Sequence, residues 1–192
     1  MGRAGQGAVS VALDLDPAVR VGMRLSLALL LLAASHHKLR DLDGFAAAVA
    51  NYRLLRDRWT RAAAAALAVG ESAVAMALLV PGLARGAAVA AVALLALYTG
   101  AIAINLIRGR REIDCGCAGP RARRPLSGSL LVRNAVLMLA AAACGLPVAT
   151  RPLVWVDAVT VAGGVTVLAF LYAAIDASLA HGPRLRALGG RA

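Results

Sequence analysis

Charged residues are scarce in this chain. Of its 192 residues only 16% are charged, whereas 60% are hydrophobic. Soluble domains average about 25% charged and about 45–50% apolar residues, so this composition excludes an ordinary soluble globular fold. It also excludes disorder, which requires a low content of apolar residues. The mean hydropathy of +0.74 indicates instead a membrane protein with several spans.

Cysteine and lysine are scarce as well. The three cysteines, Cys115, Cys117 and Cys144, are a poor number for a disulfide framework. Lys38 is the only lysine among 21 basic residues, which stand against 10 acidic ones. The basic residues cluster between apolar runs, as they do in the loops of an inner-membrane protein. Because they form no continuous stripe, we expect no nucleic-acid partner.

Several familiar sequence signals are missing. The first 17 residues lack the apolar core of a cleavable signal peptide. There is no Ser/His/Asp arrangement, no phosphate-binding loop and no haem-attachment sequence. The sequence therefore shows no classical hydrolase or transferase site, and no cofactor is evident.

Five apolar segments are present. They cover about residues 19–37, 62–83, 86–107, 130–148 and 153–175. The first just crosses a hydrocarbon core of ~30 Å if Arg20 and Arg24 reach outward to the headgroups. The pattern predicts an all-α, polytopic transmembrane helical bundle of four core spans plus a fifth. An N-terminal tail, 1–18, precedes this transmembrane domain, 19–176, and a basic C-terminal tail, 177–192, follows it.

The polar stretch between the first two spans has a helical pattern of its own. Phe45, Val49 and Tyr52 share one face, and Asp43 is placed to cap the helix. This spacing predicts a short helix in the interface plane, anchored by neighbouring basic residues and Trp59. The alternative is a solvated loop with a few apolar residues.

The basic residues also predict an orientation. Sixteen of them fall in the first loop, the 108–133 region and the C-terminal tail, which share one face of a five-span chain, and five fall on the other face. Because cytoplasmic loops carry the excess of Lys and Arg, we expect the N-terminus outside. The C-terminus and the 108–129 loop are then cytoplasmic, in a multi-pass protein of the inner (plasma) membrane.

The 108–129 loop contains the sequence Cys115-Gly116-Cys117. Two thiols separated by one residue can close a small, strained ring, and strain makes a disulfide easier to reduce. The arginines just before the motif favour a thiolate, whereas the adjacent Asp114 disfavours it. The motif is interpreted as a thiol–disulfide exchange site.

Two other interpretations of the pair stay open. Two thiolates with a His and a carboxylate would suit a soft metal such as zinc or copper, and Cys115 and Cys117 would then be the metal ligands. The pair could equally be inert loop cysteines. Cys144 lies in the fourth apolar segment and is predicted to be a core residue, with a resolving thiol as the alternative.

Glu71, within the second span, is the next candidate. A carboxylate at that depth is costly, so we expect it to face the bundle interior, as a proton relay or polar ligand contact, or as a structural carboxyl bonded to a neighbouring helix. His36, His37 and Lys38 end the first span on the face predicted for the cysteines. A His there could accept a thiol proton, and the alternative is interfacial anchoring. The polar residues Asn105 and Asn134 also collect toward this end.

At this point the residues match a known family. The matching stretches are Lys38-Leu-Arg-Asp41 followed by Phe45, Tyr52-Arg-Leu-Leu55, Glu71, Tyr98 through Leu106, Arg108-Gly-Arg110, Ile113-Asp-Cys-Gly-Cys-Ala-Gly119 and Arg133-Asn-Ala135. On these the chain resembles the MauE family of methylamine-utilisation membrane proteins, within the broader DoxX-like group. Members often carry an aromatic residue where this chain has Ala118.

The resemblance implies a role in maturing the small subunit of methylamine dehydrogenase, a secreted, disulfide-dense protein whose quinone cofactor is made from its own Trp residues. It implies a thioredoxin-like partner and a redox role for Cys115 and Cys117, and it marks Glu71 without giving it a role. Such a client lies outside, whereas the charge pattern puts the cysteines inside. Either reducing equivalents pass outward or the topology differs. The alternative is a non-catalytic membrane scaffold or transport component.

Overall fold

The computed structural model describes residues 15–116, 125–147 and 151–189, with side chains up to residue 174. This part of the chain contains six helices and one isolated β-bridge, with no β-strand. The helices are α1 (Pro17–Arg40), α2 (Leu42–Asn51), α3 (Asp57–Leu79), α4 (Ala84–Ile107), α5 (Gly128–Ala143) and α6 (Trp155–Gly189). The predicted all-α helical bundle is confirmed.

Within the described ranges, four helices are long and apolar enough to cross a membrane. They are α1, α3, α4 and the first part of α6, Trp155–Ala174. The fourth apolar segment forms the shorter helix α5, whose 16 residues span about 24 Å at 1.5 Å per residue. It ends at Ala143 because Gly145 and Pro147 do not continue a helix. The chain is thus a multi-pass membrane protein with four long apolar helices and one short one.

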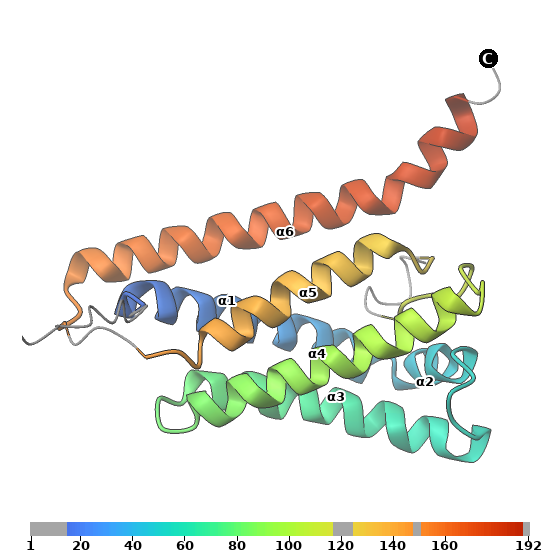
Figure 1. The fold of residues 1–192 in the computed structure, drawn as a ribbon, viewed down its shortest axis with the longest axis horizontal. Coiled ribbons are helices and arrows are strands. Elements are labelled where there is room, and N and C mark those ends of the chain that lie inside the picture. The colour runs from blue at the N-terminus through green and yellow to red at the C-terminus, as the bar shows by residue number, and fades with distance from the viewer. Residues whose placement is uncertain (1–14, 117–124, 148–150, 190–192) are drawn as a thin grey trace, which may run out of the picture.

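Small side chains let the helices approach one another closely. The central core draws Ala28 from α1, Ala75 from α3, Ala88 from α4 and Ala141 from α5, together with larger residues such as Leu31. Figure 1 shows α1 to α5 gathered in a bundle, with α6 running along one side of it. Association of helices in lipid depends on such close packing because lipid tails are as apolar as Leu.

Arg24 does not reach the headgroups as predicted. Its side chain is buried inside the bundle, and its Nε donates to the Leu78 carbonyl oxygen at 2.9 Å. Leu78 lies in the last turn of α3, where carbonyl groups have no partner within the helix. The expectation was wrong because an unsatisfied helix end lies within reach of this guanidinium.

A salt bridge joins the starts of α1 and α6. Asp16 caps α1 by accepting from the Ala18 amide at 2.8 Å. Arg151 donates to Asp16 and to Asp157, with its closest contacts to each at 2.8 Å. Hydrogen bonding to the Arg151 guanidinium, aided by the Ala18 amide, lowers the pKa of Asp16 from its ordinary 3.8.

The short helix predicted between the first two spans is α2; Phe45 on it and its C-cap residue Tyr52 are both buried. Its cap is Asp41, whose Oδ1 accepts from the Gly44 amide at 3.0 Å. The prediction of Asp43 as the cap was wrong, because the helix begins at Leu42, two residues earlier than a cap at Asp43 requires. Asp43 instead pairs with Arg61 at 3.3 Å, on the exposed surface.

Candidate functional site

The cysteine loop emerges at the end of the bundle where α2 lies and where α4 ends and α5 begins (Figure 1). Helix α4 terminates at Ile107, and Gly109 follows with φ of +74°. Glycine is favoured there because residues with a side chain rarely adopt a positive φ. A glycine in this conformation commonly ends a helix. The chain can therefore turn sharply from α4 toward α2.

Cys115 is buried at this end. Its side chain is 6% exposed and packs in a cluster with Tyr52, Ile102, Leu126 and Leu130. The Leu126 amide donates to the Ile113 carbonyl at 3.2 Å, next to the β-bridge between residues 114 and 125. Both ends of the loop are thus fastened together. Cys117 lies outside the described residues.

Gly116 presses the middle of the motif against α2. Its φ is +72°, and a Cβ placed on it would lie 3.2 Å from the Ala48 Cβ and 3.4 Å from the Phe45 ring. The Gly116 amide donates to the Asp114 Oδ1 at 3.2 Å. Both the backbone conformation and the close approach require glycine, so the motif has a defined shape at Cys115 and Gly116.

Three polar residues brace the loop from the helices. The Tyr52 hydroxyl donates to the Cys115 carbonyl oxygen at 3.3 Å. Arg110 Nη1 donates to the Tyr52 carbonyl at 3.4 Å and to Asn105 Oδ1 at 3.1 Å. Asn105 is fully buried in α4, where its Nδ2 donates to the Ala101 carbonyl. The cysteine backbone is therefore tied through Tyr52 and Arg110 to the interior of the bundle.

A buried ion pair lies beside this brace. Lys38 Nζ, on α1, is 2.5 Å from Glu71 Oε1, on α3, and the two side chains are 3% and 2% exposed. Lys38 also donates to the Tyr98 hydroxyl at 3.2 Å, and its ammonium lies 4.6 Å from the Tyr98 ring centroid and 5.0 Å from that of Phe45. Glu71 faces the interior as predicted. Interfacial anchoring is wrong for Lys38, because a carboxylate and two aromatic faces stabilise its charge inside.

The pairing of Lys38 with Glu71 was not predicted from the sequence. The available signal was composition: one lysine in an arginine-rich chain, at the end of a span, with one carboxylate inside another span. Lysine is a compact charge on a flexible stem and fits a narrow buried site better than the planar guanidinium of arginine. The second oxygen, Glu71 Oε2, is buried and has no hydrogen-bond partner among the described residues.

Phe45 connects the ion pair with the cysteine motif. Its ring centroid lies 5.0 Å from the Lys38 ammonium. The same ring would lie 3.4 Å from a Cβ placed on Gly116. Phe45 of α2 thus lies between the buried Lys38 charge and Gly116.

The two predicted histidines lie elsewhere. His36 and His37 are exposed, and their ring centroids are 6.1 Å apart. The His37 carbonyl accepts from the Asp41 amide at 3.3 Å, at the end of α1. Asn134, by contrast, is buried, and its Nδ2 donates to the Thr99 hydroxyl at 3.2 Å, which links α5 to α4.

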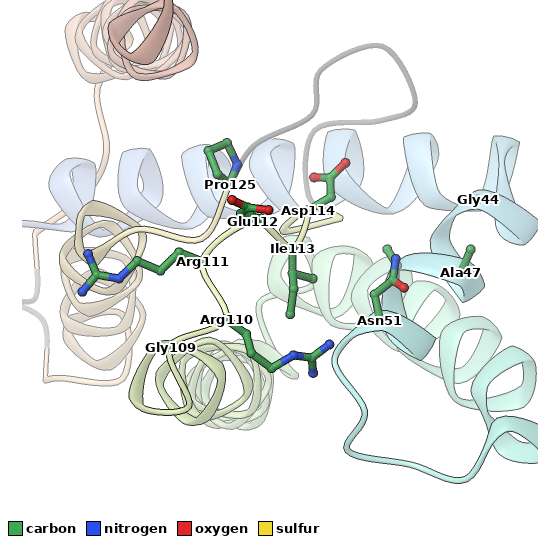
Figure 2. A pocket seen from close by; sticks show the side chains of 11 residues that line it. Gly44, Ala47, Asn51, Gly109, Arg110, Arg111, Glu112, Ile113, Asp114 and Pro125 are labelled. Carbon is green, nitrogen blue, oxygen red and sulfur yellow. The ribbon is translucent and has the colours of Figure 1, made fainter. Parts of the chain in front are cut away.

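A pocket opens between α2 and the loop. It has a volume of about 910 Å³ and is lined by Gly44, Ala47, Ala48 and Asn51 of α2, by residues 109–114 and by Pro125. Figure 2 shows the α2 side chains on one side and the loop side chains, with their mixed charges, on the other. Because Asp114 directly precedes Cys115, this pocket borders the cysteine motif.

Metal ligands do not gather in the described part of the chain. No group of three His, Cys, Asp or Glu side chains there could hold an ion. A metal site at the motif would therefore depend on Cys117, outside the described residues.

Comparison with known proteins decides the family. The family model described as "Methylamine utilisation protein MauE" matches residues 16–147. The chain belongs to this family. MauE of Paracoccus denitrificans is 46% identical over 137 residues, covering 70% of this chain and 74% of the relative. MauE of Paracoccus versutus is 39% identical over 180 residues, covering 92% and 97%, and MauE of Methylophilus methylotrophus is 43% identical over 155 residues, covering 80% and 79%.

The MauE match includes every feature of the site. Residues 16–147 contain helices α1 to α5, the buried ion pair, the brace and the cysteine motif, whereas α6 lies beyond the matched region. No solved structure matches the chain.

Proposed function

We propose that this MauE family member is a membrane accessory protein of methylamine utilisation that matures a secreted client by thiol–disulfide exchange. The supporting observation is the defined shape of the motif at Cys115 and Gly116. Gly116 adopts a positive φ and is pressed against α2, and Cys115 is buried beside it, so these two residues of the motif are built into the end of the bundle. A loop that held cysteines only by chance would not need this glycine.

The exchange proceeds in two displacements. A thiolate of one loop cysteine attacks a sulfur of the partner's disulfide, which forms a mixed disulfide and releases the other partner sulfur as a thiolate. The second loop thiolate then attacks its neighbour's sulfur and expels the partner. The loop cysteines become a disulfide, and two electrons pass to the partner, which leaves as a dithiol. The reverse sequence oxidises the partner.

Two partners follow from this proposal. A thioredoxin-like protein would restore the redox state of Cys115 and Cys117, and a secreted dehydrogenase small subunit would be the client. Exposed arginines at the cysteine end of the bundle support a cytoplasmic loop and C-terminus in the inner membrane. With that orientation, reducing equivalents pass outward from a cytoplasmic donor.

Glu71, His36 and His37 are proposed as proton-handling groups of secondary importance. Intramembrane ionisable residues commonly mark proton or ligand paths, and Glu71 is both buried and paired with Lys38. The exposed histidines could exchange protons with the loop region without being fixed to it.

The test is client maturation in cysteine variants. We expect Cys115→Ser and Cys117→Ser, alone or together, to abolish maturation, and one single variant to trap a mixed disulfide with a partner. Cys144→Ser is the matched control, because this residue is buried in the core and absent from the proposed chemistry. Full maturation in the double variant would contradict the proposal.

A scaffold or transport component is the second candidate, favoured by the buried Lys38–Glu71 pair. Under this alternative the cysteines only tie the loop, or hold a metal. It predicts that maturation survives loss of both loop cysteines but not loss of the ion pair, so the same variants distinguish the two functions.

A further inference from the structure

The backbone of Cys115 is fastened more firmly than its position in a loop would suggest. Tyr52 is the residue that ends α2, and its hydroxyl reaches across 63 residues of sequence to the Cys115 carbonyl. Its ring is buried and belongs to the cluster that encloses the Cys115 side chain. One residue thus contacts both the backbone and the side-chain surroundings of the first cysteine.

Tyr52 is itself held in place. Its carbonyl accepts from Arg110, whose guanidinium also donates to the buried Asn105, and the Arg110 amide donates to the Asn105 carbonyl at 2.9 Å. The next residue, Arg53, has φ of +50°, a conformation that is uncommon outside glycine and that persists only where the surroundings enforce it. The position of Tyr52 is therefore fixed from both sides.

This arrangement restricts the access of a partner to the Cys115 thiol. Thiol–disulfide exchange requires the attacking sulfur to approach the partner's disulfide directly, so its rate depends on access as well as on thiolate content. Cys115 is 6% exposed and packs with Tyr52, Ile102, Leu126 and Leu130, so its side chain is shielded from a protein partner.

We infer that Tyr52 is a positioning residue of the cysteine site, which keeps Cys115 as the inner thiol of the pair. The inference rests on the proposed exchange function. While the hydrogen bond to Cys115 is made, the bond to the partner forms at the other cysteine of the motif. The Cys115 thiolate then attacks that cysteine's sulfur, closes the loop disulfide and expels the partner's sulfur as a thiolate.

Alkylation rates test the positioning role without any partner. In the full-length Cys117→Ser protein, the remaining thiols are Cys115 and Cys144, and mass spectrometry follows each during reaction with a maleimide. We expect Tyr52→Phe to raise the Cys115 rate about fivefold, the factor given by loss of one hydrogen bond worth ~1 kcal/mol. The Cys144 rate should not change, because this thiol lies in the central core.

The matched control is Tyr172→Phe, which removes the hydroxyl that accepts from Arg133 and leaves the cysteine cluster untouched. It should change neither rate. Arg110→Gln removes the guanidinium that donates to the Tyr52 carbonyl, and it should also raise the alkylation rate of Cys115. An unchanged Cys115 rate in both Tyr52→Phe and Arg110→Gln, or an equal rise at Cys144, would overturn the positioning role.

A disulfide probe tests the order of bonds. With glutathione disulfide, we expect a mixed disulfide to form quickly in Cys115→Ser and slowly in Cys117→Ser, and Tyr52→Phe should accelerate only the latter. Equal rates in the two single-cysteine variants would refute the inner assignment of Cys115. The glutathione reaction requires no client, so it tests the inner position of Cys115 independently of the proposed function. Failure of the proposed function would be seen in a different experiment, as unimpaired client maturation in the cysteine variants.

Discussion

At the scale of the residue, the buried Lys38–Glu71 pair poses the sharpest energetic question. Removing two charges from water costs several kcal/mol each, and mutual attraction repays this only with good geometry. Here the ammonium has a carboxylate, a hydroxyl and two aromatic faces, whereas Glu71 Oε2 has no partner in the described ranges. Such a pair is a weak source of stability, which is consistent with a role in function.

Replacing one partner of the pair should cost more folding stability than replacing both. We predict that Lys38→Met destabilises the protein by about 3–5 kcal/mol, because Glu71 is left as an uncompensated buried charge. The double variant Lys38→Met/Glu71→Leu should recover most of that loss. Thermal unfolding in detergent measures both. If the double variant is as unstable as the single one, the pair is a structural staple, and a stable double variant that fails to mature the client assigns it to function.

At the scale of the element, the sequence predicted helices well and their mutual contacts poorly. The long apolar runs and the spacing of Phe45, Val49 and Tyr52 were sufficient for the spans and for α2, since helix periodicity is a local property. The contact of Arg24 with the end of α3, and that of Lys38 with Glu71, depend on helix rotation and depth. Those follow from the packing of the whole bundle, and sequence spacing carries little information about them.

The docking of the loop on α2 depends on Gly116. We predict that Gly116→Ala displaces the turn, because the new Cβ would lie 3.2 Å from Ala48 and a positive φ costs an alanine roughly 1–2 kcal/mol. The alkylation rate of Cys115 should rise and maturation should fall. Gly70→Ala in α3 is the control, since a Cβ there meets nothing within 4 Å. Unaltered Cys115 reactivity in Gly116→Ala would show that the contact with α2 is dispensable.

The link between α1 and α6 should depend on pH. Arg151 lowers the pKa of Asp16 below 3.8, so the stabilising charge is fully present above 3.8 and is lost as the pH falls through the lower folded value. We predict that Asp16→Asn weakens this link at neutral pH. Spin labels on the first turns of α1 and α6 would report a broader distance distribution. Wild type should show the same broadening only in strong acid, and no difference between the two proteins at neutral pH would contradict the prediction.

At the scale of the whole molecule, charge is distributed unevenly between the two ends of the bundle. Exposed arginines at the cysteine end are Arg40, Arg53, Arg56, Arg58, Arg61, Arg108 and Arg111, whereas the opposite end exposes Arg85 and Arg151. The described arginines that led to the predicted orientation therefore gather at one end of the folded bundle, and the orientation itself stays a prediction.

That orientation has a direct consequence for the mechanism. We predict that a membrane-impermeant maleimide labels Cys117 in inverted vesicles but not in intact cells, measured in a Cys115→Ser/Cys144→Ser background that leaves one thiol. Arg85→Cys in a cysteine-free chain is the matched control and should label in the reverse pattern, since it lies at the opposite end. Labelling of Cys117 from outside alone would reverse the topology. The loop would then meet a secreted client directly, and no outward transfer of reducing equivalents would be needed.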